Sequence, residues 1–83
     1  MGTRFIKASF EVEGGSNDLR QLIRDNKAQV HDAVTTVLSS RTIKELEMPG
    51  GRNALRVSLI ESINEALEVS IVEELYFLEL IIQ

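Results

Sequence analysis

Few residues of this chain have the types and spacing that chemistry at a site requires. His31 is the single histidine, and the neighbouring Asp32 would point about 100° away from it on a helix, too far round to orient the ring. The chain has no cysteine, so one histidine cannot complete the ligand set of a typical zinc site. We therefore interpret His31 as a solvent-exposed helix residue, and we expect no metal and no other cofactor.

Two carboxylates have a spacing that could support chemistry. Glu61 and Glu65 lie four residues apart, which places both on one face of a helix, where they could flank a metal or exchange protons. No histidine follows at the next helical repeat to complete a ligand set, so we interpret the pair as a solvated acidic face. The serines lack a G-x-S-x-G context and the glycine pairs lack phosphate-loop spacing. The sequence therefore predicts a protein that is not an enzyme.

Length and charge narrow the class further. Eighty-three residues correspond to a single domain, 1–83. Residues 1–56 hold nine bases and seven acids, a charge of +2, whereas residues 57–83 hold six acids and no base, a charge of −6. The acidic half and the scattered bases argue against nucleic-acid binding. No apolar run approaches the roughly 20 residues that a membrane helix needs.

Both ends of the chain have the two-residue period of a strand. In the first segment the apolar side chains share one parity and Gly14-Gly15 ends the run: Ile6, Ala8, Phe10, Val12. In the last segment one parity is wholly apolar and is expected to face the core: Tyr76, Leu78, Leu80, Ile82. The other parity mixes Leu75, Phe77 and Ile81 with Glu79, and something must cover so much apolar surface. We therefore take Leu75, Phe77 and Ile81, together with Glu61 and Glu65, as a candidate interface.

Helical periodicity fills the region between the strands. The spacing predicts one helix over about 17–39 with a kink or break near Asn26, where Asn26 and Gln29 could form a capping box. Thr42 and Glu45 predict another capping box, which would start a short helical turn at Ile43. Pro49 and the glycines after it end that turn, and a second long helix is expected over about 52–67.

The expected order is strand, helix, short helix, helix, strand. This is an α+β fold with the helices packed on a small antiparallel sheet. A sheet of two strands is marginal, so the design looks one strand short. The core is expected to gather these residues: Ile6, Phe10, Val34, Leu38, Leu55, Leu59, Ile63, Leu78, Leu80.

Three segments together resemble the FliL family of flagellar basal-body-associated proteins, in its C-terminal periplasmic domain. They are RFIKASFEVE, then VHDAVTTVLSSRTIKELEMPGGRNALRVSLIESIN, then VEELYFLELIIQ. The resemblance rests on these positions: Leu38-Ser39-Ser40-Arg41-Thr42, Glu45-Leu46, Pro49, Gly51, Leu55-Arg56, Ile63-Asn64 and Tyr76-Phe77 through Gln83. The membrane helix and linker that open family members are not in this sequence. A strand that precedes the first one in the family is missing here or reduced to Met1-Gly2-Thr3.

The resemblance implies a fold similar to the stomatin/prohibitin (SPFH) domain and a place in the periplasm, anchored through the bacterial inner membrane. It implies a structural and interaction module of the flagellar motor that supports torque and motility beside the stator proteins MotA and MotB. Self-association into a ring or filament-like contact is expected from the apolar parity and the charge split. Two alternatives stay open: a generic stomatin-like scaffold unrelated to motility, and a small ligand-binding α+β module or an enzyme fragment.

Overall fold

The computed structural model describes residues 5–83, and its elements follow the expected order. They are β1 (Ile6–Gly14), α1 (Leu19–Asp25), α2 (Lys27–Ser39), α3 (Ile43–Glu47), α4 (Gly51–Leu67) and β2 (Val72–Ile82). The α+β class is confirmed. The family strand sought at Met1-Gly2-Thr3 lies outside the described residues.

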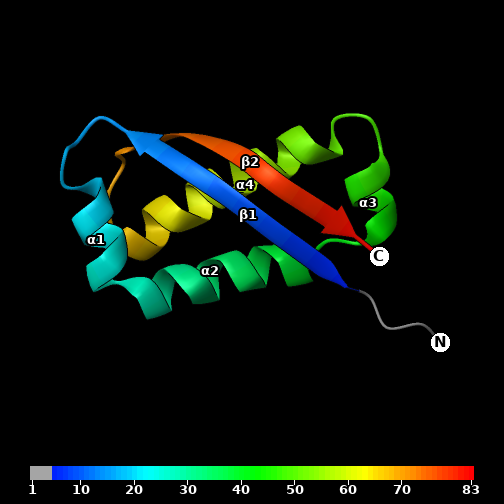
Figure 1. Ribbon diagram of the computed structural model, residues 1–83, viewed down its shortest axis with the longest axis horizontal. Helices are drawn as coiled ribbons and strands as arrows, with labels where there is room; N and C mark the ends of the chain where they lie inside the picture. The colour runs from blue at the N-terminus through cyan, green and yellow to red at the C-terminus, as the bar shows by residue number, and fades with distance from the viewer. Residues whose placement is uncertain (1–4) are drawn as a thin grey trace.

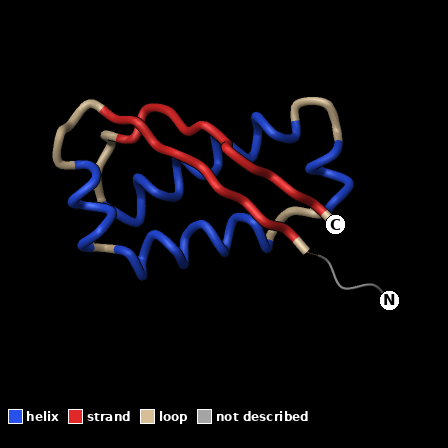
Figure 2. Tube along the Cα trace, viewed as in Figure 1, coloured by secondary structure: helices blue, strands red, loops and turns tan. Residues whose placement is uncertain are grey.

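In the described part of the chain, β1 and β2 form one antiparallel sheet, which lies across one side of the helices (Figure 1). Figure 2 shows both strands running the length of the molecule, so that the first and last described residues meet at the same end. There the amide of Phe5 donates to the carbonyl of Gln83 at 2.7 Å, and the amide of Gln83 donates back at 2.8 Å. The sheet therefore joins the two extremes of the described chain.

The predicted break at Asn26 is confirmed, but its cause differs from the expected one. The Asn26 side chain donates through Nδ2 to the carbonyl of Leu22 at 2.9 Å, and it makes no capping bond to α2. The expected capping box with Gln29 is therefore wrong. A side chain that bonds back to the preceding turn ends α1 rather than starting α2.

The connector between the long helices forms as predicted. The hydroxyl of Thr42 accepts from the amide of Glu45 at 3.0 Å, and the Glu45 carboxylate accepts from the amide of Thr42 at 3.3 Å. This reciprocal capping box starts α3 at Ile43. Gly50 then adopts a left-handed conformation, with φ of 81°, which lets the chain reverse into α4.

Helix α4 supplies the centre of the core. Leu55, Leu59, Ile63 and Leu67 recur along one stripe and are all buried. Helix α2 packs on α4, and α4 packs on β2. Of the predicted core, Leu55, Leu59 and Ile63 are buried, and five residues pack against the core partly buried: Ile6, Phe10, Val34, Leu38, Leu80. The prediction that Leu78 belongs to the core is wrong, because its side chain is 64% exposed.

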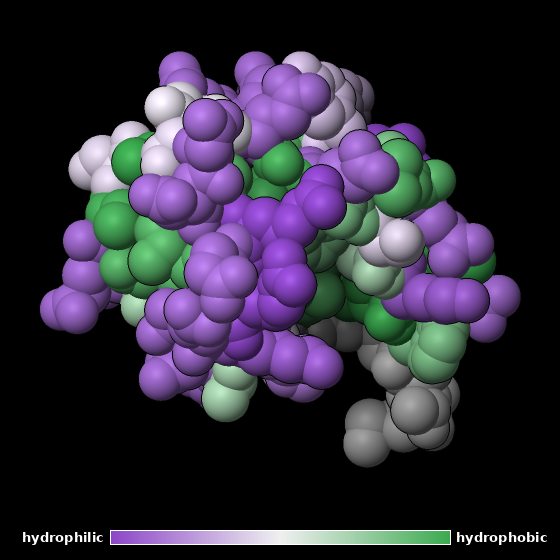
Figure 3. Space-filling view, turned by 60° about the vertical axis from the view of Figure 1, so that its left-hand side comes forward, coloured by the Kyte–Doolittle hydropathy of each residue, from purple (hydrophilic) through white to green (hydrophobic). Residues whose placement is uncertain are grey.

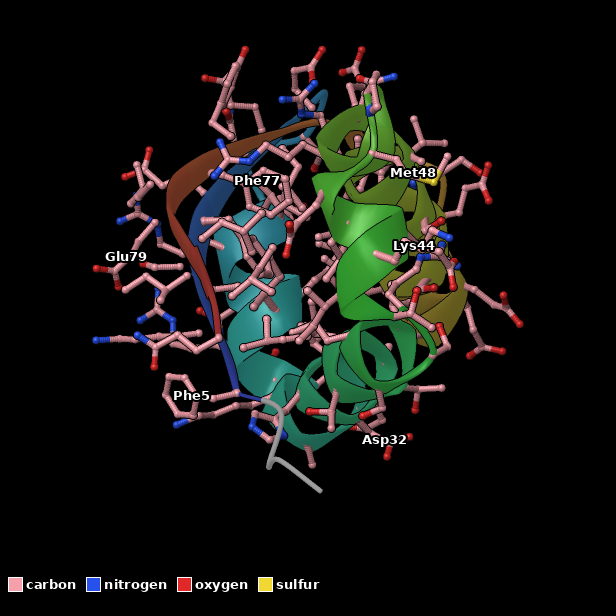
Figure 4. All side chains as sticks on the ribbon, turned by 90° about the vertical axis from the view of Figure 1, so that its right-hand side faces the viewer. Phe5, Asp32, Lys44, Met48, Phe77 and Glu79 are labelled. Atoms are coloured by element: carbon pink, nitrogen blue, oxygen red, sulfur yellow. The ribbon has the colours of Figure 1, made fainter. Side chains whose placement is uncertain are left out.

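A bulge in β2 explains that error. Ser9 pairs with Glu79, but the next residue, Phe10, pairs with Phe77, so Leu78 is skipped. One extra residue on one strand reverses which side chains face the core on either side of it. Figure 4 shows the result, with Phe77 between the sheet and the helices and Glu79 on the outer side.

Candidate interaction surfaces

The bulge changes which residues of β2 can meet another molecule. Leu75 is 0% exposed, and the ring of Phe77 packs edge-on to that of Phe10, with centroids 6.3 Å apart and planes at 82°. The expectation that Leu75 and Phe77 face outward is therefore wrong. These two side chains hold β2 to the rest of the fold.

The outer sheet face is the side of β1 and β2 turned away from the helices. Ile81 lies on it, half-buried, opposite Lys7 of β1, and Lys7 pairs with Glu79 at 3.5 Å. Tyr76 shares this side, and both Tyr76 and the skipped Leu78 are exposed large apolar residues. Of the predicted apolar interface residues, Ile81 alone is on an accessible face, and Tyr76 and Leu78 join it.

Glu61 and Glu65 lie elsewhere. Both are exposed, and their positions on α4 fall opposite the buried stripe that contains Leu59 and Ile63. Glu65 borders a shallow hollow between α4 and α2 that also includes Asp32. Among the described residues, no group of three or more His, Cys, Asp or Glu residues is arranged to hold a metal ion. The predicted interface is thus divided between two separate surfaces.

A third surface was not foreseen from the sequence. An open groove of about 510 Å³ separates β1 from α2, because α2 packs on α4 and not closely on the sheet. We call it the β1–α2 groove, and its apolar wall is formed by these residues: Ile6, Ala8, Phe10, Ile23, Val30, Val34, Leu38. Figure 3, which brings the end of the molecule with α1 toward the viewer, shows apolar side chains gathered in patches between broad hydrophilic areas.

Basic side chains line the helical side of this surface. Lys27 and His31 border the β1–α2 groove, and Arg20 and Arg24 border the adjoining hollow beside Val12. All four are exposed, which confirms the interpretation of His31 as a solvated helix residue. Arg20 and Arg24 are four residues apart on α1, and Lys27 and His31 are four apart on α2, so each pair lies on one face of its helix. Bases that look scattered along the chain are therefore gathered in space.

Several positions that carry the resemblance to the FliL family hold the fold together. The guanidinium of Arg41 donates to the hydroxyl of Ser58, which ties the connector before α3 to α4. The amide group of Asn64 bonds both main-chain groups of Val72 at the start of β2. The Thr42 cap belongs to the same set. These residues fix the relative positions of α3, α4 and β2.

The fold and these surfaces define a small α+β domain whose motif residues support its architecture. The model of the family "Flagellar basal body-associated protein FliL" matches residues 1–83, and the chain belongs to this family. It is also similar to the flagellar protein FliL of Aquifex aeolicus (strain VF5), with 28% identity over 81 residues, which is 98% of this chain.

The chain spans about half (50%) of the length of that relative. Within the described residues, no helix has both the length and the apolar character to cross a membrane.

Proposed function

We propose that this chain is the periplasmic, non-enzymatic interaction domain of a flagellar motor protein anchored in the inner membrane. Its role is to associate with the stator proteins MotA and MotB and thereby to support torque and motility. The observation that carries this proposal is the family match over the whole of residues 1–83. The similarity to the Aquifex FliL protein points to the same family.

Self-association belongs to the same proposal, through the outer sheet face. Tyr76 and Leu78 are 47% and 64% exposed, and Ile81 adds a third apolar side chain on β2. The acidic pair of α4, Glu61 and Glu65, would then meet the more basic first part of a neighbouring copy, in a ring or filament-like contact. A stomatin/prohibitin-like arrangement of the strands and helices is part of this proposal.

The experiment uses the full-length protein in the bacterium that encodes it. A fluorescent fusion should localise at flagellar bases, lose that localisation when the stator genes are deleted, and restore swimming to a strain that lacks its own copy. Membrane localisation away from flagella would instead indicate a generic stomatin-like scaffold. Unchanged localisation without the stator genes would exclude the stator as the partner.

Self-association is tested separately by sedimentation at high protein concentration. Leu78→Glu should weaken it, because it places a charge among the apolar side chains of the outer sheet face. Met48→Glu is the matched control, since Met48 is an exposed apolar residue at the end of α3, away from the strands in Figure 4. Equal effects of the two substitutions would remove the outer sheet face from the proposal.

A further inference from the structure

The bulge in β2 exposes apolar side chains on the outer sheet face. Because the strand pairing skips Leu78, its side chain leaves the alternation and is 64% exposed. Tyr76, two residues earlier in β2, is 47% exposed on the same face. Among the described residues the helices lie on the opposite side of the sheet (Figure 1). A bulge that re-aims a side chain is common beside functional sites, and this apolar pair is therefore a candidate contact surface.

Carboxylates flank this apolar pair. Glu11 lies directly opposite Tyr76 in the sheet, and Glu74 is the preceding residue of β2 on the same face. Glu74 in turn lies opposite Glu13, and like charges in opposite positions destabilise an antiparallel pair. Of the described strand residues Lys7 is the one base, and it is already paired at the far end of the face. The outer sheet face therefore has unpaired negative charge beside its exposed apolar side chains.

Complementary charge is present on the helices of the same chain. Arg20 and Arg24 are four residues apart on one face of α1, and both are exposed. In the described part of the chain, neither of them forms an ion pair with a carboxylate. These arginines lie in the helical layer and the outer sheet face is turned away from that layer, so each surface keeps its charge for another molecule (Figure 1).

Helix α1 has dimensions that suit the outer sheet face. An α-helix is about 10 Å wide and two paired strands cover about 10 Å, so one helix covers both strands. Arg20 and Arg24 are about 6 Å apart along the helix axis. Glu11 and Glu74 are diagonal neighbours across the two strands, at about 7–8 Å. One arginine can therefore reach each carboxylate while the helix lies over Tyr76.

Arginine suits both parts of this surface. Its planar guanidinium group bonds carboxylates and stacks on aromatic rings, here the ring of Tyr76. Its aliphatic chain can cover Leu78, which leaves water when the contact forms. The contact thus buries exposed apolar side chains and pairs charges that are unpaired in a single copy.

We propose that the outer sheet face of one copy binds helix α1 of a second copy. The two arginines of α1 pair with the carboxylates of Glu11 and Glu74, and the helix covers Tyr76. The contact joins different surfaces of the two copies, so it repeats from copy to copy. It rests on the self-association proposed above and adds the element that meets the sheet.

The experiment reverses the charges of each surface separately. The sheet variant combines Glu11→Lys with Glu74→Lys, and the helix variant combines Arg20→Glu with Arg24→Glu. In sedimentation at high protein concentration, each variant alone should associate at least about ten-fold more weakly than the wild type, because like charges then meet. An equimolar mixture should associate within about three-fold of the wild type, since each variant presents the charges that the other one needs.

Two controls accompany the mixture. Lys44→Glu changes one charge on α3, apart from the strands in Figure 4, and it should alter association by less than about two-fold. Urea unfolding shows whether each variant is folded. The sheet variant should be no less stable than the wild type, because Glu74→Lys places a base opposite Glu13.

The outcomes separate this contact from self-association itself. A wild type that stays monomeric at high concentration overturns both. A wild type that associates while the mixture of folded variants stays dissociated overturns the contact alone. The contact is also overturned if Glu61→Lys with Glu65→Lys, and not the sheet variant, restores association of the helix variant, since α4 would then supply the acids.

Discussion

The side chain of Asn64 bonds both main-chain groups of Val72. Its Nδ2 donates to the Val72 carbonyl at 3.0 Å, and its Oδ1 accepts from the Val72 amide at 2.9 Å. One carboxamide thus takes the place of a neighbouring strand at the first residue of β2, and it fixes where β2 leaves α4.

Loss of this contact should destabilise the fold. Asn64→Ala leaves two partly buried main-chain groups of Val72 without their partner, so it should lower the free energy of unfolding by about 1–3 kcal/mol. Asn64→Asp should also destabilise, because a carboxylate cannot donate to the Val72 carbonyl. Asn53→Ala is the control, since the exposed Asn53 bonds only the side chain of Arg56, and its effect should stay within about 0.5 kcal/mol. Urea denaturation gives all three values, and equal effects at both sites would contradict the role of Asn64.

The bulge in β2 makes neighbouring residues behave differently. Phe77→Ala removes the contact of this ring with Phe10. Truncation of a buried phenylalanine costs about 3–5 kcal/mol, and the cost here should be somewhat less because the ring of Phe77 is only partly buried. Leu78→Ala should stay within about 0.5 kcal/mol, because its side chain is in solvent. Thermal or urea unfolding of the two variants decides the point. A larger cost at Leu78 than at Phe77 would restore the parity expected from the sequence.

Leu59 is at the centre of the core. It is 0% exposed on α4, so Leu59→Ala should cost about 2–5 kcal/mol through lost burial and the cavity left behind. Val57→Ala on the same helix provides the comparison, because Val57 is exposed and its loss should change stability little. Similar midpoints for these two variants would mean that α4 is rotated from its described position.

The contribution of the α3 capping box to stability can be measured in the same way. Thr42→Ala removes the hydroxyl that accepts from the Glu45 amide, and it should cost about 1 kcal/mol. Thr36→Ala is a suitable control, because Thr36 is exposed within α2 and alanine is a better helix former there. If Thr42→Ala changes the free energy of unfolding as little as the control does, the capping box does not contribute to stability in solution.

The two glycines before α4 should differ in their response to substitution. Gly50 has a φ of 81° with open space around it, so Gly50→Ala should cost about 1–2 kcal/mol from backbone strain alone. A Cβ on Gly51 would lie 2.8 Å from the carbonyl oxygen of Leu46 and would also clash with that of Glu45, so α3 and α4 would have to move apart. Gly51→Ala is therefore expected to destabilise more than Gly50→Ala, and the reverse order would show that the close approach of α3 is not maintained.

Local signals in the sequence were sufficient for most of the fold. The alternation in β1, the stripe of α4 and the Thr42 to Glu45 spacing each depend on residues close together in the chain, and each was predicted correctly. The bulge at Leu78 depends on how β2 pairs with a strand at the other end of the chain. No local pattern reveals it, and it reversed the expected exposure of Phe77.

The same limit explains what was missed at the surfaces. Arg20 and Lys27 look like isolated bases until α1 and α2 lie beside β1. The groove beside them exists because α2 packs on α4 and not on the sheet. The spacing of apolar residues predicts that one side of α2 is buried, but it does not predict which element covers that side. Asn26 is a local example of the same limit. Its side chain could have capped α2 or bonded the preceding turn, and the sequence did not show that it bonds the carbonyl of Leu22.

The pairing of Phe5 with Gln83 has a consequence for the order of folding. A contact between residues so distant in sequence requires closure of almost the whole described chain, which is slow and entropically costly. The contacts of α2, α3 and α4 with one another involve shorter loops and can form first. We therefore expect the sheet to assemble last. Until the strands pack on α4, the apolar stripe of this helix is exposed to solvent on the side that faces the sheet.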